Sequence, residues 1–172
     1  MAFYVLTADS FKFAEREAIT RRNLVPGSKK NQLGVTSAQK SPLKVIVDSN
    51  ALFVPFQFKI DIFAELGSLL ERRFELILLS PIRRELEILA SKGSLKMRKM
   101  AGSALKLAEN CMQVEIKVPE STLVDDVIID AAEEWGAMVF TNDRQLRKRL
   151  RDISVPVIYL RQKSRLAIDG LV

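Results

Sequence analysis

The stretch Val45-Ile46-Val47-Asp48-Ser49-Asn50 decides the fold, because three consecutive β-branched apolar residues come directly before a carboxylate. A short, continuous apolar run of this kind is typical of a strand that is buried on both faces, as in a parallel sheet covered by helices. A carboxylate at the end of such a strand lies near the buried sheet, where a charge is costly unless a cation or hydrogen-bond donors meet it. We therefore expect Asp48 to differ from an ordinary surface acid.

Downstream of this stretch, short apolar runs alternate with segments of helical periodicity, which is the pattern of βα units around a parallel sheet. The runs predict four further strands, at 76–79, 114–118, 138–140 and 155–160. The periodic segments predict helices at 59–72, 81–90, 95–109, 123–135 and 143–150. The sequence thus predicts an α/β fold with five strands between helices, and no internal repeat.

Upstream, residues 23–43 are rich in Gly, Ser, Pro, Asn and Lys and lack apolar periodicity, as expected of a flexible linker. Residues 9–22 could form a short charged helix before it, but the apolar face of that helix is too thin to fold alone. We interpret 1–43 as a flexible or accessory arm, with an overlong start-codon assignment as the alternative. The domain itself is expected at 44–172.

The composition excludes several kinds of chemistry. The 172 residues include no histidine, which excludes Ser-His-Asp triads, histidine general bases and imidazole metal sites. A single cysteine, Cys111, excludes an internal disulfide and a thiolate zinc site. The chain has no apolar run long enough to span a bilayer and no basic leader, so we expect a soluble, cytoplasmic protein. Acid–base and metal chemistry must therefore come from carboxylates.

The chain is basic, with 27 Lys and Arg against 21 Asp and Glu and a net charge of +6. A basic balance suits an anionic partner, although a solvated helix surface is the ordinary explanation of a charged run. The basic residues cluster at Arg83-Arg84, at Lys96-Arg98-Lys99, at Arg144-Arg147-Lys148-Arg149-Arg151 and at Arg161-Lys163-Arg165.

Acidic residues recur at the carboxyl end of a predicted strand, or in the first turn of the helix that follows it. In an open parallel sheet these ends lie along one edge, where ligands collect at a topological switch point. Carboxylates gathered there would repel one another, so a positive group must lie among them, and Mg²⁺ or Mn²⁺ suits oxygen ligands best. The residues at these positions are Asp48, Glu85, Asp125, Asp126 and Asp143.

Every one of these acids except Asp48 also has an ordinary structural explanation. Asp125, Asp126 and Asp143 could be helix caps or first-turn acids. Glu85 and its neighbour Glu87 could form ion pairs with the arginines at 83 and 84.

Four stretches, taken in order, resemble the acidic motifs of the PIN-domain nucleases. They are Val-Asp-Ser-Asn-Ala-Leu (47–52), Leu-Ser-Pro-Ile-Arg-Arg-Glu-Leu (79–86), Val-Asp-Asp-Val-Ile-Ile-Asp-Ala-Ala (124–132) and Phe-Thr-Asn-Asp-Arg-Gln-Leu-Arg-Lys-Arg-Leu (140–150). The resemblance covers about 44–160 and is strongest to small stand-alone archaeal PIN proteins and to the ribosomal-RNA-processing branch. It implies a three-layer PIN-like fold whose five-stranded parallel sheet has the order 3-2-1-4-5.

The resemblance also implies roles for individual residues. The implied supporting polar residues are Asn50 and Thr141. Of the aspartate doublet, the helix-opening pattern 126–132 favours Asp126, with Asp125 as an alternative or fifth ligand. The implied catalytic and metal-binding acids are Asp48, Glu85, Asp126 and Asp143. Basic side chains must lead a phosphate chain to an acidic pocket, and the RNA-contacting residues expected on this ground are Arg144, Arg147, Lys148 and Arg151.

The function implied by the resemblance is that of a divalent-metal-dependent endoribonuclease that cleaves single-stranded RNA, using Mg²⁺ or Mn²⁺ to activate water. Its role would be RNA processing, with a pre-ribosomal partner and structured RNA as a further substrate, or that of a VapC-type toxin with an antitoxin partner. The alternative is a non-catalytic PIN-like RNA-binding or assembly module.

The predicted helix at 95–109 carries more apolar residues than one small sheet obviously needs. We therefore also predict a homodimer that pairs through this helix, with a simple core helix as the alternative. The residues concerned are Leu95, Met97, Met100, Ala104, Leu105 and Ala108.

Overall fold

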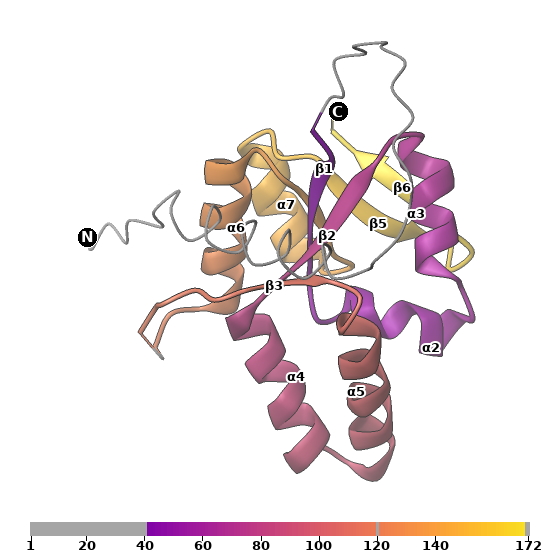
Figure 1. Cartoon of the computed structure of the whole chain (residues 1–172), viewed down its shortest axis with the longest axis vertical. Helices are drawn as coiled ribbons and strands as arrows, with labels where there is room; N and C mark the ends of the chain where they lie inside the picture. Colours follow the sequence, from indigo (N-terminus) through magenta and orange to yellow (C-terminus); the bar gives the residue numbers. More distant parts are fainter. Residues whose placement is uncertain (1–40, 120, 171–172) are drawn as a thin grey trace, which may run out of the picture.

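A computed structural model describes residues 41–119 and 121–170. Within these ranges a single sheet is flanked by helices, and two of the helices form a hairpin that projects beyond one edge of the sheet (Figure 1). The predicted helix at 9–22 and nearly all of the predicted linker lie outside the described residues. No helix in the described ranges is long and apolar enough to cross a membrane.

The sheet has six strands in the order β3-β2-β1-β4-β5-β6. The first five are parallel, which confirms the predicted order 3-2-1-4-5, and the sixth is antiparallel to β5. The register pairs Val47 of β1 with Phe140 of β4, so that Asp48 and Thr141 follow at the same level on neighbouring strands. The strands are β1 (Leu43–Val47), β2 (Phe74–Leu79), β3 (Met112–Val114), β4 (Met138–Phe140), β5 (Val157–Arg161) and β6 (Arg165–Asp169).

The helices confirm the predicted alternation, with changes at their ends. They are η1 (Ala51–Phe53), α2 (Val54–Phe58), α3 (Ile62–Leu70), α4 (Ser80–Lys92), α5 (Leu95–Ala108), α6 (Val124–Trp135) and α7 (Arg144–Asp152). The prediction of a helix over 59–72 was too long, because the Asp61 side chain caps α3 by accepting hydrogen bonds from the amides of Phe63 and Ala64. The short helices η1 and α2 were not predicted.

The third strand was predicted over 114–118, but it is β3, at Met112–Val114. β3 pairs only with β2, from Ile77 opposite Met112 to Leu79 opposite Val114. β2 ends there because the chain turns into α4 at Ser80, so residues beyond Val114 have no strand to pair with. The alternation that suggested a longer strand has another cause: Ile116 is buried without being part of the sheet.

The sixth strand was not predicted. β5 and β6 form a hairpin whose turn contains Gln162 and Lys163, with φ of 52° and 57°. A turn with two positive φ values usually carries Gly, Asn or Asp, so these two residues gave no turn signal in the sequence.

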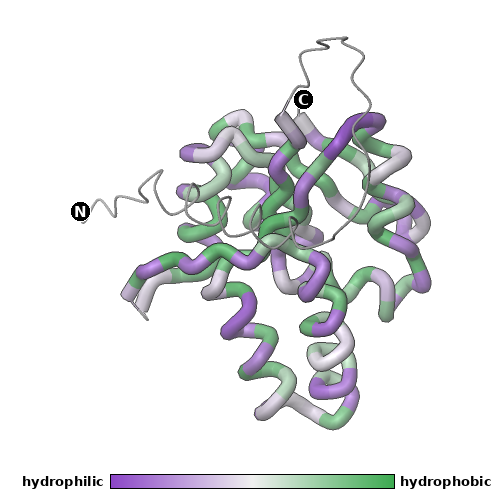
Figure 2. Tube along the Cα trace, viewed as in Figure 1, coloured by the Kyte–Doolittle hydropathy of each residue, from purple (hydrophilic) through white to green (hydrophobic). Residues whose placement is uncertain are grey.

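The core fills the space between the sheet and the helices. Figure 2 shows the hydrophobic residues gathered along the strands and on the inner sides of the helices. Val45, Ile46 and Val47 are completely buried, as the opening stretch predicted for a strand that is covered on both faces. The carboxyl ends of the parallel strands therefore lie together beside the apolar core, at the edge where the α4–α5 hairpin projects (Figure 1).

Candidate active site

Asp48 lies at the carboxyl end of β1, the strand between β2 and β4, and its residue is only 6% exposed. Hydrogen-bond donors surround its carboxylate. Oδ1 accepts from the Ser49 amide at 2.6 Å, and Oδ2 accepts from the Asn50 amide side chain at 2.6 Å and the Thr141 hydroxyl at 2.7 Å. These donors hold the buried group in a single orientation.

Asn50 and Thr141 link the ends of β1 and β4. Asn50 Oδ1 accepts from the amide of Asn142 at 2.8 Å, and Thr141 Oγ1 accepts from the amide of Asp143 at 3.0 Å. Asn142 in turn accepts from the Leu160 amide at 2.7 Å, which joins this loop to β5. The two residues expected to support the site thus lie beside Asp48 and orient the loop that carries Asp143.

The pKa of Asp48 is raised from 3.8 to about 6. Burial is the largest cause, and the charges of Glu85 and Asp125 raise the pKa further, while the hydrogen bonds from Thr141 and Ser49 lower it. Glu85 of α4 and Asp125 of α6 are therefore near enough to act on Asp48 at the end of β1. A raised carboxyl pKa of this origin, in a network built at a strand end, is typical of a functional site.

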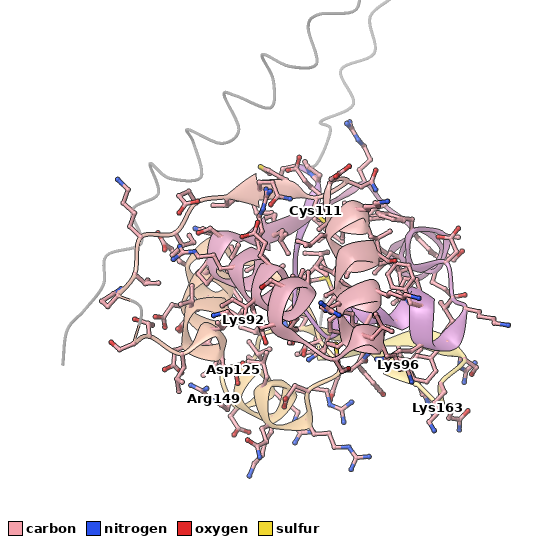
Figure 3. All side chains as sticks on the ribbon, turned by 90° about the horizontal axis from the view of Figure 1, so that it is seen from below. Lys92, Lys96, Cys111, Asp125, Arg149 and Lys163 are labelled. Carbon is pink, nitrogen blue, oxygen red and sulfur yellow. The ribbon has the colours of Figure 1, made fainter. Side chains whose placement is uncertain are left out.

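Asp125 belongs to the same group of charges. It lies in the first turn of α6 (Figure 3), and its pKa is raised by burial and by the charge of Asp143, against the lowering effect of Arg149. Asp143 is exposed and caps α7, accepting from the amides of Gln145 at 2.6 Å and Leu146 at 3.1 Å through Oδ1. The capping role weighed for Asp143 is therefore real, and it leaves Oδ2 outside the cap.

Asp126, the member of the doublet that the sequence favoured, is engaged elsewhere. Its carboxylate forms an ion pair with Arg149 of α7, at 2.6 Å, and half of each side chain remains in solvent. Its charge does not contribute to the raised pKa of Asp48, whereas that of Asp125 does. Figure 3 shows Asp125 and Arg149 near each other, where α6 and α7 are in contact.

The oxygen donors at the strand ends have the chemistry that a hard cation requires. They are carboxylate, amide and hydroxyl oxygens with a net negative charge, which fit Mg²⁺ or Mn²⁺ by chemistry. Among residues 41–119 and 121–170, however, no three His, Cys, Asp or Glu side chains are close enough to enclose an ion. This geometry fits Mg²⁺ held by one or two carboxylates, with water and substrate phosphate completing its coordination.

Two residues in the network were not singled out from the sequence, Ser49 and Asn142. Ser49 donates through its backbone amide, which no side-chain motif could reveal, and its hydroxyl lies 3.4 Å from the same carboxylate oxygen. Asn142, which follows β4, links Asn50 to β5: its amide donates to Asn50 Oδ1, and its Oδ1 accepts from the Leu160 amide. The sequence indicated Asn142 only through its position, next to Thr141 in the polar run that follows the apolar strand β4.

The four basic residues predicted to contact RNA lie on α7, which begins at Asp143. Arg147 lies over the ring of Tyr159, with 4.3 Å from the guanidinium carbon to the ring centroid. Asp169 of β6 accepts ion pairs from Arg147 at 3.9 Å and Arg151 at 3.8 Å. Arg144 and Lys148 are exposed and form no ion pair with any other described residue.

Comparison with known proteins gives consistent results. The family described as PIN like domain matches residues 45–163. The chain is 35% identical over 135 residues to ribonuclease VapC4 of Methanocaldococcus jannaschii, covering 75% of this chain and 98% of that protein. It is 31% identical over 126 residues to ribonuclease VapC9 of Archaeoglobus fulgidus, covering 73% and 89%.

Among solved structures, the PIN domain endonuclease Utp24 superposes with a TM-score of 0.62 at 25% identity, covering 76% of this chain and 94% of that one. The region that the family model matches, residues 45–163, contains Asp48, Glu85, Asp125, Asp126 and Asp143. The fold, the strand order and the sequence matches agree, and this chain belongs to the PIN-domain nuclease family.

Proposed function

We propose that this chain is a divalent-metal-dependent endoribonuclease that cleaves single-stranded RNA. The observation that carries the proposal is Asp48, which is a buried, donor-held carboxylate near the charges of Glu85 and Asp125. Burial and the charges of Glu85 and Asp125 oppose its ionisation, so the site favours occupation by a cation. The ribonuclease names of both relatives support RNA as the substrate.

In this proposal each residue has a defined task. Asp48 holds the metal directly, and Asn50 and Thr141 fix its orientation. Asp143, whose Oδ1 caps α7, and Glu85 of α4 add negative charge beside the site and act on the metal through bound water. For the α6 ligand we propose Asp125, with Asp126 held away by Arg149; this reverses the preference drawn from the sequence. When bound, Mg²⁺ or Mn²⁺ supplies activation of water and stabilisation of charge on the phosphate.

The proposal is tested by cleavage of a fluorescein-labelled single-stranded RNA with Mg²⁺, Mn²⁺ or EDTA. Losing several kcal/mol of transition-state stabilisation should make Asp48→Asn at least about 100-fold slower than the wild type. Asp130→Asn is the matched control, because this acid is exposed on the same helix as Asp125 and has no described partner. Equal rates in purified Asp48→Asn would overturn the role of Asp48, and wild-type protein that binds this RNA without metal-dependent cleavage would favour the non-catalytic RNA-binding or assembly module.

The biological role divides into two proposals with different partners. The VapC names of both relatives favour a toxin-type nuclease with an antitoxin partner. The resemblance of the four acidic motifs to the ribosomal-RNA-processing branch leaves RNA processing as the second candidate. Affinity purification of the tagged protein from its native cell separates them: a small stoichiometric protein supports the first, and pre-ribosomal particles support the second.

A further inference from the structure

The α4–α5 hairpin carries uncompensated positive charge. From residue 88 to residue 108 the chain has five Lys or Arg and no Asp or Glu. All five are exposed, and none forms an ion pair with another described residue, although several other basic side chains of α4 and α7 do. The five residues are Lys92, Lys96, Arg98, Lys99 and Lys106.

Four of these residues gather around the tip of the hairpin, where α4 ends and α5 begins; we call Lys92, Lys96, Arg98 and Lys99 the hairpin tip. α4 ends at Lys92, and α5 starts at Leu95 with Lys96 and Arg98 in its first turn and no acid there. A helix begins with a partial positive charge, so basic residues in its first turn are unfavourable for folding. Lys92 is favourable in the last turn of α4, but Lys96 and Arg98 place positive charge in the first turn of α5, where an acid would stabilise the helix.

The ordinary explanation, a solvated helix surface, does not account for this arrangement. A solvated face usually pairs opposite charges at i and i+4, as Arg83 and Glu87 do at the start of α4, with 2.9 Å between Nε and Oε1. Lys96 and Lys99 are instead like charges at i and i+3. Such neighbours repel and cost stability unless an anion lies between them.

The hairpin tip lies at the same edge of the fold as the carboxylates. α4 follows β2 directly, and Glu85 in its second turn affects the pKa of Asp48. α5 packs against η1, which begins three residues after Asp48. Figure 1 shows the hairpin projecting beyond this edge, and Figure 3, seen from below, shows Lys92 on the flank of the hairpin nearer Asp125 and Lys96 on the other.

From Glu85 to Lys92 is seven residues of one helix, or about 10 Å along its axis. A polyanion bound at the carboxylates could therefore reach the hairpin tip within a few monomer units. A single small anion could not contact both the carboxylate site and the hairpin tip. The spacing favours an extended chain of phosphates over an isolated phosphate ion.

We propose that the hairpin tip binds the phosphodiester backbone of the RNA strand, to one side of the phosphate at the carboxylates. The inference rests on the proposed function and extends it to a second contact surface, separate from α7. Binding there is electrostatic and independent of base sequence, since lysines act as point charges on phosphates. The hairpin tip would hold long RNA in place while short RNA depends on the carboxylate site alone.

The test compares Lys96→Gln/Lys99→Gln with Arg72→Gln/Arg73→Gln. The control removes the same charge just before β2, at the opposite end of that strand from α4. Binding of a fluorescein-labelled oligouridylate of about 16 nucleotides is measured in EDTA across a salt series. Cleavage in Mn²⁺ is measured beside it on a short oligomer of about 2 nucleotides, whose single phosphodiester occupies the carboxylate site alone. Melting temperature checks that all variants fold.

The hairpin variant should lower the slope of log K against log salt by about 1.4, because each single-strand phosphate contact contributes about 0.7. Its cleavage of the short oligomer, and the binding slope of the control variant, should match the wild type. An unchanged slope in the hairpin variant, or an equal fall in the control, would overturn the inference and leave the hairpin tip to an acidic protein partner. Wild-type protein that neither binds nor cleaves RNA would overturn the proposed function as well.

Discussion

At Asp48, two opposing effects act on one carboxylate. Burial removes water from the charge and favours the protonated form, while three donors from Ser49, Asn50 and Thr141 favour the ionised form. Burial prevails, since the pKa rises to about 6. The donors therefore orient the group without fully compensating its charge, which leaves an energetic reason to bind a cation.

This balance predicts how stability depends on pH in metal-free protein. The folded pKa lies above the unfolded value, so the folded state binds the proton more tightly and is destabilised as pH rises from about 4 through about 6. At 1.36 kcal/mol per pKa unit, the contribution of Asp48 to this loss is about 3 kcal/mol. Urea unfolding in EDTA at pH 4.5 and 7.5 measures about 2 kcal/mol of this loss, because part of it occurs below pH 4.5, near the pKa of the unfolded carboxyl.

The control for this effect is Asp48→Asn, which cannot ionise. Its free energy of unfolding should change less over the same pH interval than that of the wild type, and it should be the more stable protein at pH 7.5. Equal pH dependence in the two proteins would show that other groups account for the loss.

The aspartate doublet illustrates a limit of sequence reasoning at the residue scale. Adjacent residues on a helix point about 100° apart, so only one of Asp125 and Asp126 can face the strand ends. The rotation of α6 is set by its buried face, which includes Ile128, Ala131 and Ala132, and by the Arg149 ion pair, none of which a local motif reports. The position of Asp48 was predictable because a strand end needs no such rotation.

The doublet gives a matched pair of variants. Asp125→Asn should reduce RNA cleavage at least about 10-fold more than Asp126→Asn does, because only Asp125 is electrostatically linked to Asp48. Asp126→Asn removes a half-exposed ion pair and should cost at most about 1 kcal/mol of stability. Steady-state cleavage rates and urea midpoints measure the two effects, and the reverse order of rates would restore Asp126 as the ligand.

At the scale of elements, α7 divides its basic residues into two pairs. Arg144 and Lys148 are exposed and one turn apart, whereas Arg147 and Arg151 are held by Asp169, with Arg147 also over Tyr159. Groups already engaged by β6 lose part of that interaction when they turn to a phosphate. The four RNA contacts expected from the sequence are therefore unequal.

We predict that Arg144→Gln/Lys148→Gln lowers the salt slope of RNA binding by about 1.4, and that Arg147→Gln/Arg151→Gln lowers it by less. The second pair should instead lower stability by about 1 kcal/mol, through the lost cation–π contact and ion pairs. Fluorescence anisotropy and thermal unfolding of both double variants separate the two roles. A larger slope change in the second pair would contradict this division.

The elements themselves were predictable where local pattern and pairing agree. The apolar runs at 45–47 and 138–140 are short, continuous and central in the sheet, and both are strands. The edges were less predictable, because β3 stops where β2 provides no further partner and β6 depends on a turn without Gly or Asn. Edge strands are defined by neighbours that lie far away in the sequence.

At the scale of the whole molecule, the homodimer stays a prediction, and α5 exposes less apolar surface for it than the sequence suggested. Ala104 and Ala108 are buried, and Met97, Met100 and Leu105 pack partly against the core, so α4 and η1 take up most of the face that suggested pairing. Leu95 alone of the six residues is largely exposed. Light scattering at tens of micromolar measures the mass, and the Leu95→Ser variant should shift a true dimer toward the monomer.

The last prediction joins the site to the stability of the molecule. A cation that binds only the folded state stabilises it by mass action, by about 2.7 kcal/mol when its concentration is 100 times its Kd. Each kcal/mol shifts Tm by about 2–8 °C for domains of this size range, so millimolar Mg²⁺ or Mn²⁺ should raise Tm measurably at pH 7.5. At pH 5 the shift should be smaller, because the proton competes with the metal for Asp48.

Asp48→Asn should melt at a higher temperature than the wild type in EDTA at pH 7.5 and respond little to either metal, while Asp130→Asn should behave as the wild type. A metal response that is lost in Asp48→Asn and kept in Asp130→Asn indicates a metal site. General screening of charge would instead shift the Tm of all three proteins alike. Absence of any metal-dependent shift in the wild type would contradict the shared site. Because the cost of the buried charge at Asp48 is relieved by a proton, by the amide substitution or by a cation, each of the three should reduce the effect of the others.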